Sequence, residues 1–171
     1  MKSYLLFLLF SIVSYTCLAQ TTAISHQDVA SVEAITAAGL RIISGPKGQA
    51  RDMDAFKALF LPGAQLGGVF FKDDSSFVRI TTAEKFAERN GPAYQNLGFY
   101  ENQLALRVEQ FGNIATAFQT YETRTGSKDG KIEDRGVNTY QLVYDQGRWW
   151  IASLIFTPES AKFTIPEKYL K

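Results

Sequence analysis

Hydrophobic and polar residues change their spacing near the middle of this chain. Before residue 99, small and aliphatic residues recur at steps of three and four, which is the period of one face of a helix. After residue 99, apolar and polar residues alternate over long stretches, which is the period of half-buried β-strands. The pattern predicts one α+β domain in which helices come first and long antiparallel strands follow.

Capping residues and helix breakers set the ends of three predicted helices. Ser25 caps one continuous first helix, with Asp28 in its first turn, and Asp52 caps a second helix that carries Phe56, Leu59 and Phe60. Thr81 and Glu84 form a capping box for the third. The helices end or turn at Gly45-Pro46, Pro62-Gly63 and Gly91-Pro92, and two short strands, residues 65–72 and 76–80, precede the third helix.

The first long strand has one apolar and one charged face. Its predicted apolar face consists of Tyr100, Asn102, Leu104, Leu106 and Val108. A tight turn at Gly112-Asn113 places Phe111 opposite Ile114 and Val108 opposite Ala117 in the next strand. Ala115, Ala117, Gln119 and Tyr121 then continue the same inward face.

The last two strands, residues 135–144 and 148–156, have no solvated face. We prefer a three-residue loop, residues 145–147, because a two-residue loop would require a positive φ at Gln146. The three-residue loop pairs Tyr144 with Arg148 and places Gln141 and Ser153 on the face of Trp149 and Ile151.

The first 19 residues have the layout of a signal peptide. Lys2 precedes the short apolar stretch 4–13, and small or polar residues lead to a cleavage position after Ala19. A lipoprotein start at Cys17 is not favoured, because the residues before it make a poor lipobox. We expect an exported chain, periplasmic or secreted, with no membrane anchor after processing: residues 1–19 as signal peptide, 20–157 as the domain and 158–171 as a C-terminal tail.

Composition narrows the function classes. The 18 Lys and Arg residues nearly balance 17 Asp and Glu residues, so no charge excess attracts nucleic acid. One His and one Cys are too few for a zinc site or a disulfide framework. We expect no nucleic-acid partner, no metal and no cofactor.

The order of elements resembles that of the nuclear transport factor 2-like superfamily, in an exported bacterial branch close to the SnoaL-like proteins. The phrases that carry the resemblance are Gly98-Phe99-Tyr100-Glu101, Phe111-Gly112-Asn113-Ile114-Ala115, Thr120-Tyr121-Glu122, Arg135-Gly136-Val137-Asn138-Thr139 and Gly147-Arg148-Trp149-Trp150-Ile151. The resemblance covers about residues 26–157. It implies a cone-shaped α+β fold, with three N-terminal helices packed in a strongly curved antiparallel sheet and a pocket at the wide end.

The enzymes of that superfamily give specific expectations. Ketosteroid isomerase-like members need a carboxylate and acidic donors in an apolar cavity, and the first helix here has no tyrosine. Scytalone dehydratase-like members need histidines, and His26 is the single one. Glu101, Arg107 and Glu122 imitate the charges of limonene epoxide hydrolase-like members, but the alternation places them on the charged face. An inward Asp or Glu would favour catalysis.

Polar residues on the predicted inward face are the candidates for a ligand pocket. They are Tyr100, Asn102, Gln119, Tyr121, Gln141 and Ser153. The leading hypothesis is a non-enzymatic domain that binds a small, mainly apolar molecule. The alternatives are a lyase, isomerase or hydrolase acting on a cyclic or polyketide-like metabolite, and a dimeric assembly module with a residual pocket.

The outer face of the last two strands predicts a homodimer. It is expected to expose a contiguous apolar patch of Tyr140, Leu142, Trp150, Leu154 and Phe156. Two such faces can pack about a two-fold axis. The alternative is that the tail, with Phe163, Ile165 and Tyr169, folds back over the patch in a monomer.

Overall fold

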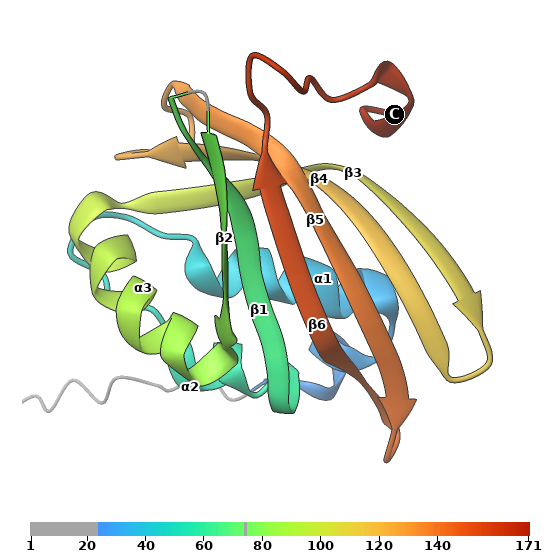
Figure 1. Cartoon of the computed structure of the whole chain (residues 1–171). Coiled ribbons are helices and arrows are strands. Elements are labelled where there is room, and N and C mark those ends of the chain that lie inside the picture. The colour runs from blue at the N-terminus through green and yellow to red at the C-terminus, as the bar shows by residue number, and fades with distance from the viewer. Residues whose placement is uncertain (1–23, 74) are drawn as a thin grey trace, which may run out of the picture.

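The computed structural model describes residues 24–171 except residue 74, so the predicted signal peptide, Cys17 and the cleavage site after Ala19 lie outside the described residues. The helices are η1 (His26–Val29), α1 (Val32–Ile43), α2 (Met53–Lys57), α3 (Ala83–Leu97) and η2 (Glu167–Tyr169). The strands are β1 (Phe60–Lys72), β2 (Ser75–Thr82), β3 (Phe99–Phe111), β4 (Ile114–Thr125), β5 (Ile132–Asp145) and β6 (Arg148–Pro158) (Figure 1). In this part of the chain, no helix has both the length and the apolar character that crossing a bilayer requires.

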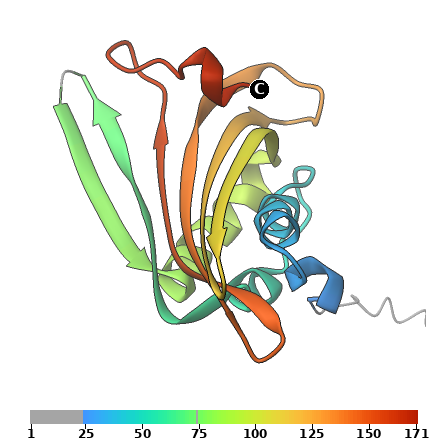
Figure 2. The ribbon, with the colours of Figure 1, turned by 90° about the vertical axis from the view of Figure 1, so that its right-hand side faces the viewer.

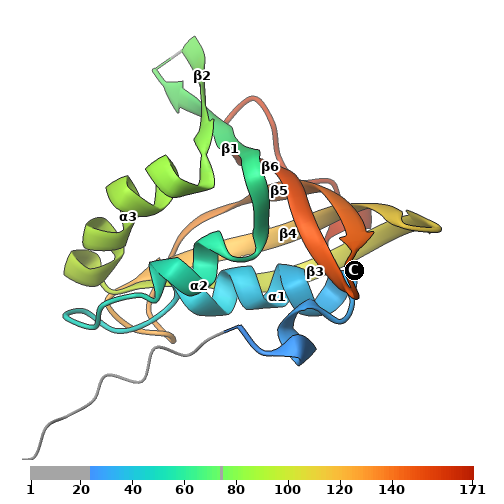
Figure 3. The same ribbon diagram turned by 90° about the horizontal axis from the view of Figure 1, so that it is seen from below.

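The six strands form one curved sheet in the order β2-β1-β6-β5-β4-β3. Only the β1–β6 pair is parallel, and the other neighbours are antiparallel. Seen from below, the strands make an arc with α1, α2 and α3 on its inner side (Figure 3), and Figure 2 shows the bend of the sheet from the side. The α+β architecture expected from the sequence is confirmed, with α3 entering after the β1–β2 hairpin.

The N-terminal helix is divided in two, so the prediction of one continuous helix is wrong. Ser25 and Asp28 form a reciprocal capping box, as expected, but it starts only the short turn η1. Ser31 is extended, with φ −142° and ψ 167°, and its hydroxyl accepts a hydrogen bond from the Ala34 backbone N–H at 3.1 Å. This second cap offers the backbone an alternative to continuing the first turn, and α1 starts after it.

The ends of the next two helices also differ from the prediction. The second helix stops at Lys57, and Phe60 belongs to β1, where it pairs with Ile151 of β6. Pairing with a long buried strand outweighs one more helical turn in a segment this short. The third helix takes Thr82 as its cap in place of Thr81 and continues through Pro92 to Leu97. Its last turn is fixed by Tyr94, whose ring stacks on Phe99 at 4.6 Å.

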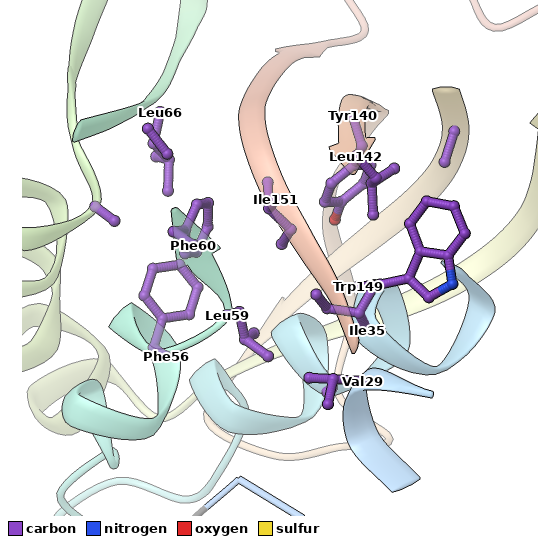
Figure 4. Packing of buried hydrophobic residues seen from close by; sticks show 14 of the residues in the cluster. Val29, Ile35, Phe56, Leu59, Phe60, Leu66, Tyr140, Leu142, Trp149 and Ile151 are labelled. Carbon is purple, nitrogen blue, oxygen red and sulfur yellow. The ribbon is translucent and has the colours of Figure 1, made fainter. Parts of the chain in front are cut away.

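The core lies between the concave face of the sheet and the helices (Figure 4). Ile35 of α1, Leu59, Leu66 of β1 and Ile151 of β6 are almost completely inaccessible to solvent. Phe56 packs between Phe60 and Phe86, with ring centroids 5.1 and 5.7 Å away. Burying one such side chain contributes about 1.5–3 kcal/mol to the free energy of folding, so these contacts fix the helices on the sheet.

The C-terminal tail returns across the convex face of the sheet. The Tyr169 ring packs on Phe118 of β4 at 4.4 Å, and the Tyr169 carbonyl accepts a hydrogen bond from the Thr120 hydroxyl at 2.6 Å. Arg107 of β3 donates to the Lys168 carbonyl. The tail does fold back onto the sheet, but its η2 packs on β3 and β4, so the alternative in which it covers the face predicted for dimerisation is not what the structure shows.

Gly136 of β5 provides a test of this packing. A Cβ at this position would lie 2.3 Å from the Tyr121 hydroxyl and 2.5 Å from the Thr157 carbonyl oxygen. We expect Gly136→Ala to lower the free energy of unfolding in urea by about 1–3 kcal/mol, as overpacking does. Gly39→Ala in α1 is the matched control, because its Cβ meets only Leu59 at an ordinary 3.8 Å. Equal stability of the two variants would contradict the packing described.

Candidate functional site

A cavity of about 310 Å³ lies between the concave face of the sheet and helices α1 and α3. Its lining is mainly aliphatic and aromatic, and its polar members come from three strands and α3. The polar lining residues are Arg89, Asn90, Tyr94, Glu101, Tyr121, Thr123, Asp134, Asn138 and Tyr140. Of the six residues predicted to form a pocket, only Tyr121 lines this cavity.

A bulge in β3 explains why Glu101 enters the cavity. Gln103 pairs with Tyr121 and Ala105 with Thr120, so Leu104 is an extra residue without a partner. One extra residue reverses the faces of the strand beyond it. The register predicted on the other side of the bulge is confirmed, since Val108 pairs with Ala117 and Phe111 with Ile114.

The prediction that Tyr100 and Asn102 face inward and Glu101 outward is therefore wrong. The Asn102 amide donates to the Glu122 carboxylate at 3.3 Å on the convex side. Tyr100 lines a crevice at the sheet edge, next to α1. Ala117, predicted on the inward face, is a buried core residue that does not line the cavity.

The loop between β5 and β6 causes the second reversal. Asp145 pairs with Arg148, so the loop has two residues, Gln146 and Gly147, with φ values of 51° and 79°. The predicted three-residue loop is wrong by one position, and β5 presents the opposite face to the helices. Gln141 and Ser153, predicted to line a pocket, pair with each other outside the cavity, and Gln141 is exposed.

Most of the patch predicted for dimerisation lies inside the molecule. Tyr140 and Leu142 are buried in the core, and Leu154 and Phe156 line the cavity because Ala152 forms a bulge in β6. Trp150 alone of the five lies on the convex face, where the Arg148 guanidinium stacks over its ring at 3.7 Å. The predicted patch does not exist as an exposed surface, although the inward placement of Trp149 and Ile151 is confirmed.

A polar network holds Glu101 at the cavity wall. The Asn138 amide donates to Glu101 Oε1 at 3.0 Å and to Gln119 Oε1 at 3.2 Å. The Tyr140 hydroxyl donates to the same Gln119 oxygen at 2.9 Å, and Gln119 Nε2 donates to Gln103 Oε1 at 2.8 Å. Gln119, predicted as a ligand contact, is completely buried and orients Asn138 and Tyr140.

Burial makes the Glu101 carboxyl a weaker acid than an ordinary glutamate. It raises the pKa of the Glu101 carboxyl from its ordinary 4.5 to about 7, and the hydrogen bond from Asn138 opposes this rise only in part. The side chain keeps some exposure, because the cavity and the crevice beside α1 both reach it. Near neutral pH this carboxyl therefore exists in both protonation states, as a group that accepts and returns protons must.

Two tyrosine hydroxyls accompany the carboxyl. Tyr94 of α3 and Tyr121 of β4 line the cavity, and neither hydroxyl has a hydrogen-bond partner among residues 24–73 and 75–171. Burial and the nearby Glu101 raise the pKa of both phenols, so they stay protonated as donors. Arg89, Asn90 and Asp134 complete the polar part of the lining.

No protein-family model and no curated protein matches this chain. Among solved structures, the chain is similar to a protein of unknown function with a cystatin-like fold from Nostoc punctiforme, with a TM-score of 0.59 and 11% identity over 76% of this chain and 90% of that one. It is also similar to a candidate dehydratase of the NTF2-like family from Streptomyces avermitilis, with a TM-score of 0.55 and 14% identity over 78% and 97% of the two chains. The chain has the nuclear transport factor 2-like fold.

A third similar structure widens the range of roles on this nuclear transport factor 2-like fold. It is the β subunit of a candidate aromatic-ring-hydroxylating dioxygenase from Novosphingobium aromaticivorans, with a TM-score of 0.58 and 11% identity over 81% of this chain and 92% of that one. Identities at this level establish the fold and leave the chemistry to the site itself.

The site agrees with one of the three enzyme patterns of nuclear transport factor 2-like proteins considered above. His26 is exposed in η1 and does not line the cavity. Arg107 and Glu122 lie on the convex face, where Glu122 pairs with Arg124 at 2.7 Å, so they do not join Glu101. A carboxyl with tyrosine donors in an apolar cavity does occur, with its donor tyrosines on α3 and β4 and not on the first helix.

The raised pKa of Glu101 predicts a pH-dependent stability. Because the folded state binds the proton more tightly, this contribution is complete below pH 4.5 and is lost as pH rises through about 7. Glu101→Gln keeps an acceptor for Asn138 and carries no charge. We expect this variant to exceed the parent in unfolding free energy by about 1–3 kcal/mol near pH 8, with the gain vanishing toward pH 4.5.

Urea unfolding at a series of pH values measures this difference. Glu109→Gln is the matched control, because Glu109 is exposed on the opposite face of the same strand. A parallel pH profile for the parent and Glu101→Gln would mean that the Glu101 carboxyl titrates as it does in water.

Proposed function

We propose that this chain binds a small, mainly apolar molecule in the cavity and that Glu101 moves a proton on it, as a general acid and base. The observation that carries the proposal is a carboxyl with a pKa of about 7 on the wall of a largely apolar cavity. General bases work best when their pKa lies near the operating pH. Proton abstraction next to a carbonyl, leading to isomerisation or elimination, is the reaction class that fits.

The polar groups that take part in this reaction have separate roles. Ionised Glu101 takes a proton from a carbon beside the carbonyl, and the electron pair of that C–H bond moves onto the carbonyl oxygen. The Tyr94 or Tyr121 hydroxyl donates a hydrogen bond to this oxygen as its charge develops. Protonated Glu101 then returns the proton to another carbon, which completes an isomerisation, or to a departing hydroxyl, which completes a loss of water. Asn138 keeps the carboxyl aimed at the cavity.

Binding without catalysis and assembly are the competing functions. A pure binder of apolar molecules gains nothing from a carboxyl whose burial costs free energy, so Glu101 favours the catalytic reading. The similar structure described as a candidate dehydratase belongs to the same reaction class. The similar dioxygenase β subunit is the comparison that favours an assembly role.

Export and dimerisation stay predictions from the sequence. Residues 1–19 carry the signal-peptide pattern on which export rests. A homodimer, if formed, has to use a face other than the predicted patch, and Trp150 is the member of that patch still available on the convex side.

Deuterium exchange tests proton transfer without knowledge of the natural substrate. Deuterated cyclohexanone is small, apolar and carries exchangeable deuterium beside its carbonyl. We expect the parent protein to accelerate the exchange, with a rate that rises with pH through about 7 as Glu101 ionises. Glu101→Gln should slow this exchange by about a hundredfold, whereas Glu109→Gln should not change it.

NMR follows the loss of deuterium, and the same samples report binding of the ketone. Equal exchange rates for the parent and Glu101→Gln, with the ketone bound to both, would support a binding function and contradict the catalytic one.

A further inference from the structure

A second hollow opens on the inner side of the β1–β2 hairpin. It has a volume of about 400 Å³ and shares Phe70, Phe86, Arg89 and Phe156 with the cavity that holds Glu101. Figure 3 shows this hairpin extending past α3, away from the body of the sheet. The shared lining makes the hollow, called here the hairpin groove, a continuation of the cavity.

Aromatic rings line the way from β2 to the cavity. Phe77 stacks on Phe70 at 5.6 Å, and Phe70 meets the edge of Phe156 at 5.5 Å. Gly68 makes room for this arrangement, because a Cβ there would lie 2.6 Å from the Phe156 ring. The rings offer an apolar body a continuous surface between the groove and the cavity.

The charged residues that line the hairpin groove are all basic. Arg79 and Arg89 line the hairpin groove, and no Asp or Glu is among its lining residues. Within the described chain, neither arginine forms an ion pair, and Arg79 lies over the Phe77 ring at 5.0 Å. Glu84 and Glu88 of α3 act on Lys57 of α2, which itself pairs with Asp54 at 2.7 Å, and neither glutamate lines the groove.

The other end of the path is acidic. Glu101 and Asp134 both line the cavity that the groove extends. An anionic group is therefore repelled from the Glu101 end and attracted to the two arginines, whose guanidinium groups suit a carboxylate. This asymmetry fixes the direction in which a ligand with one charged end can enter.

The sheet register sets the separation of the two ends. Arg79 pairs with Gly68, Gly68 with Phe156, and Phe156 with Asn138, the residue that holds Glu101. Three strand spacings separate the first from the last, which corresponds to about 14 Å. A molecule that contacts both ends has to be elongated.

Building on the cavity function proposed above, we propose that the natural ligand is an elongated apolar carboxylate. Its anionic end lies between Arg79 and Arg89 in the hairpin groove, its apolar body follows Phe70 and Phe156, and its far end reaches Glu101. The hairpin groove is thus a specificity subsite that selects acids over neutral molecules of the same length.

Decanoate and decanol are the probes, since they share an alkyl chain and differ in charge. Calorimetric titrations near pH 8, below the micelle concentration, should show that the parent protein binds decanoate at least about tenfold more tightly than decanol. Arg79→Gln and Arg89→Gln should each weaken the binding of decanoate by about tenfold and leave the binding of decanol unchanged. Lys85→Gln, which removes a positive charge one helical turn from Arg89 but outside the groove lining, is the matched control and should change neither.

Added salt should weaken the binding of decanoate selectively, because both arginines are exposed to solvent. Equal affinity for the two probes, no binding of decanoate to the parent, or full affinity in the double arginine variant would each overturn the subsite. Arg79 lies outside the cavity that holds Glu101, so cyclohexanone exchange does not require it, and Arg79→Gln separates failure of the subsite from failure of proton transfer by Glu101.

Discussion

The extra residue in β3 decides on which side of the sheet Glu101 lies. With Leu104 unpaired, the half of the strand that follows the helices turns its charged face inward, while the half near the hairpin keeps Leu106 and Val108 against the core. A regular strand would leave the carboxyl in water on the convex side. The location, acidity and proposed chemistry of Glu101 all depend on this one irregularity, and bulges beside binding sites often re-aim a side chain in this way.

The free-energy balance at Glu101 explains why the surrounding network is built as it is. A rise of the pKa from 4.5 to about 7 means that burial outweighs the single hydrogen bond from Asn138. A stronger set of donors would return the carboxyl to its ordinary acidity, and a bare apolar wall would keep it protonated at neutral pH. Gln119 holds Asn138 and Tyr140 through one oxygen and leaves the carboxyl half satisfied. The network is therefore suited to a group that changes its protonation state.

Much of the fold was accessible from the sequence, because burial patterns and turns specify it strongly. The α+β order and the hairpin pairing of Phe111 with Ile114 follow from alternation and turn chemistry, and the inward direction of Trp149 follows from the family resemblance. The bulges at Leu104 and Ala152 did not follow, because an extra residue leaves the local composition of a strand almost unchanged. The second cap at Ser31 was equally hidden inside a helical repeat.

The candidate site was predicted less well than the fold, because an error of one residue in register moves every side chain of a strand to the opposite face of the sheet. For the last hairpin, the prediction rests on the strain of a positive φ at Gln146, and the structure accepts that φ and follows the polarity of β5. Thr139 and Gln141 lie outside while Tyr140 and Leu142 are buried, so the polarity of β5 itself was the better guide. Applying that rule would also have placed Asn138 inward, next to the carboxyl.

Direct titration of the Glu101 carboxyl tests the central claim most closely. NMR of side-chain carboxyl carbons, with Glu101→Gln to assign the signal, follows its protonation from acid to neutral pH. The midpoint should lie near 7, far from the ordinary 4.5, because the bulge at Leu104 turns the carboxyl into the cavity. A midpoint near 4.5 would mean that Glu101 faces water, and it would contradict both the placement of the carboxyl and the function built on it.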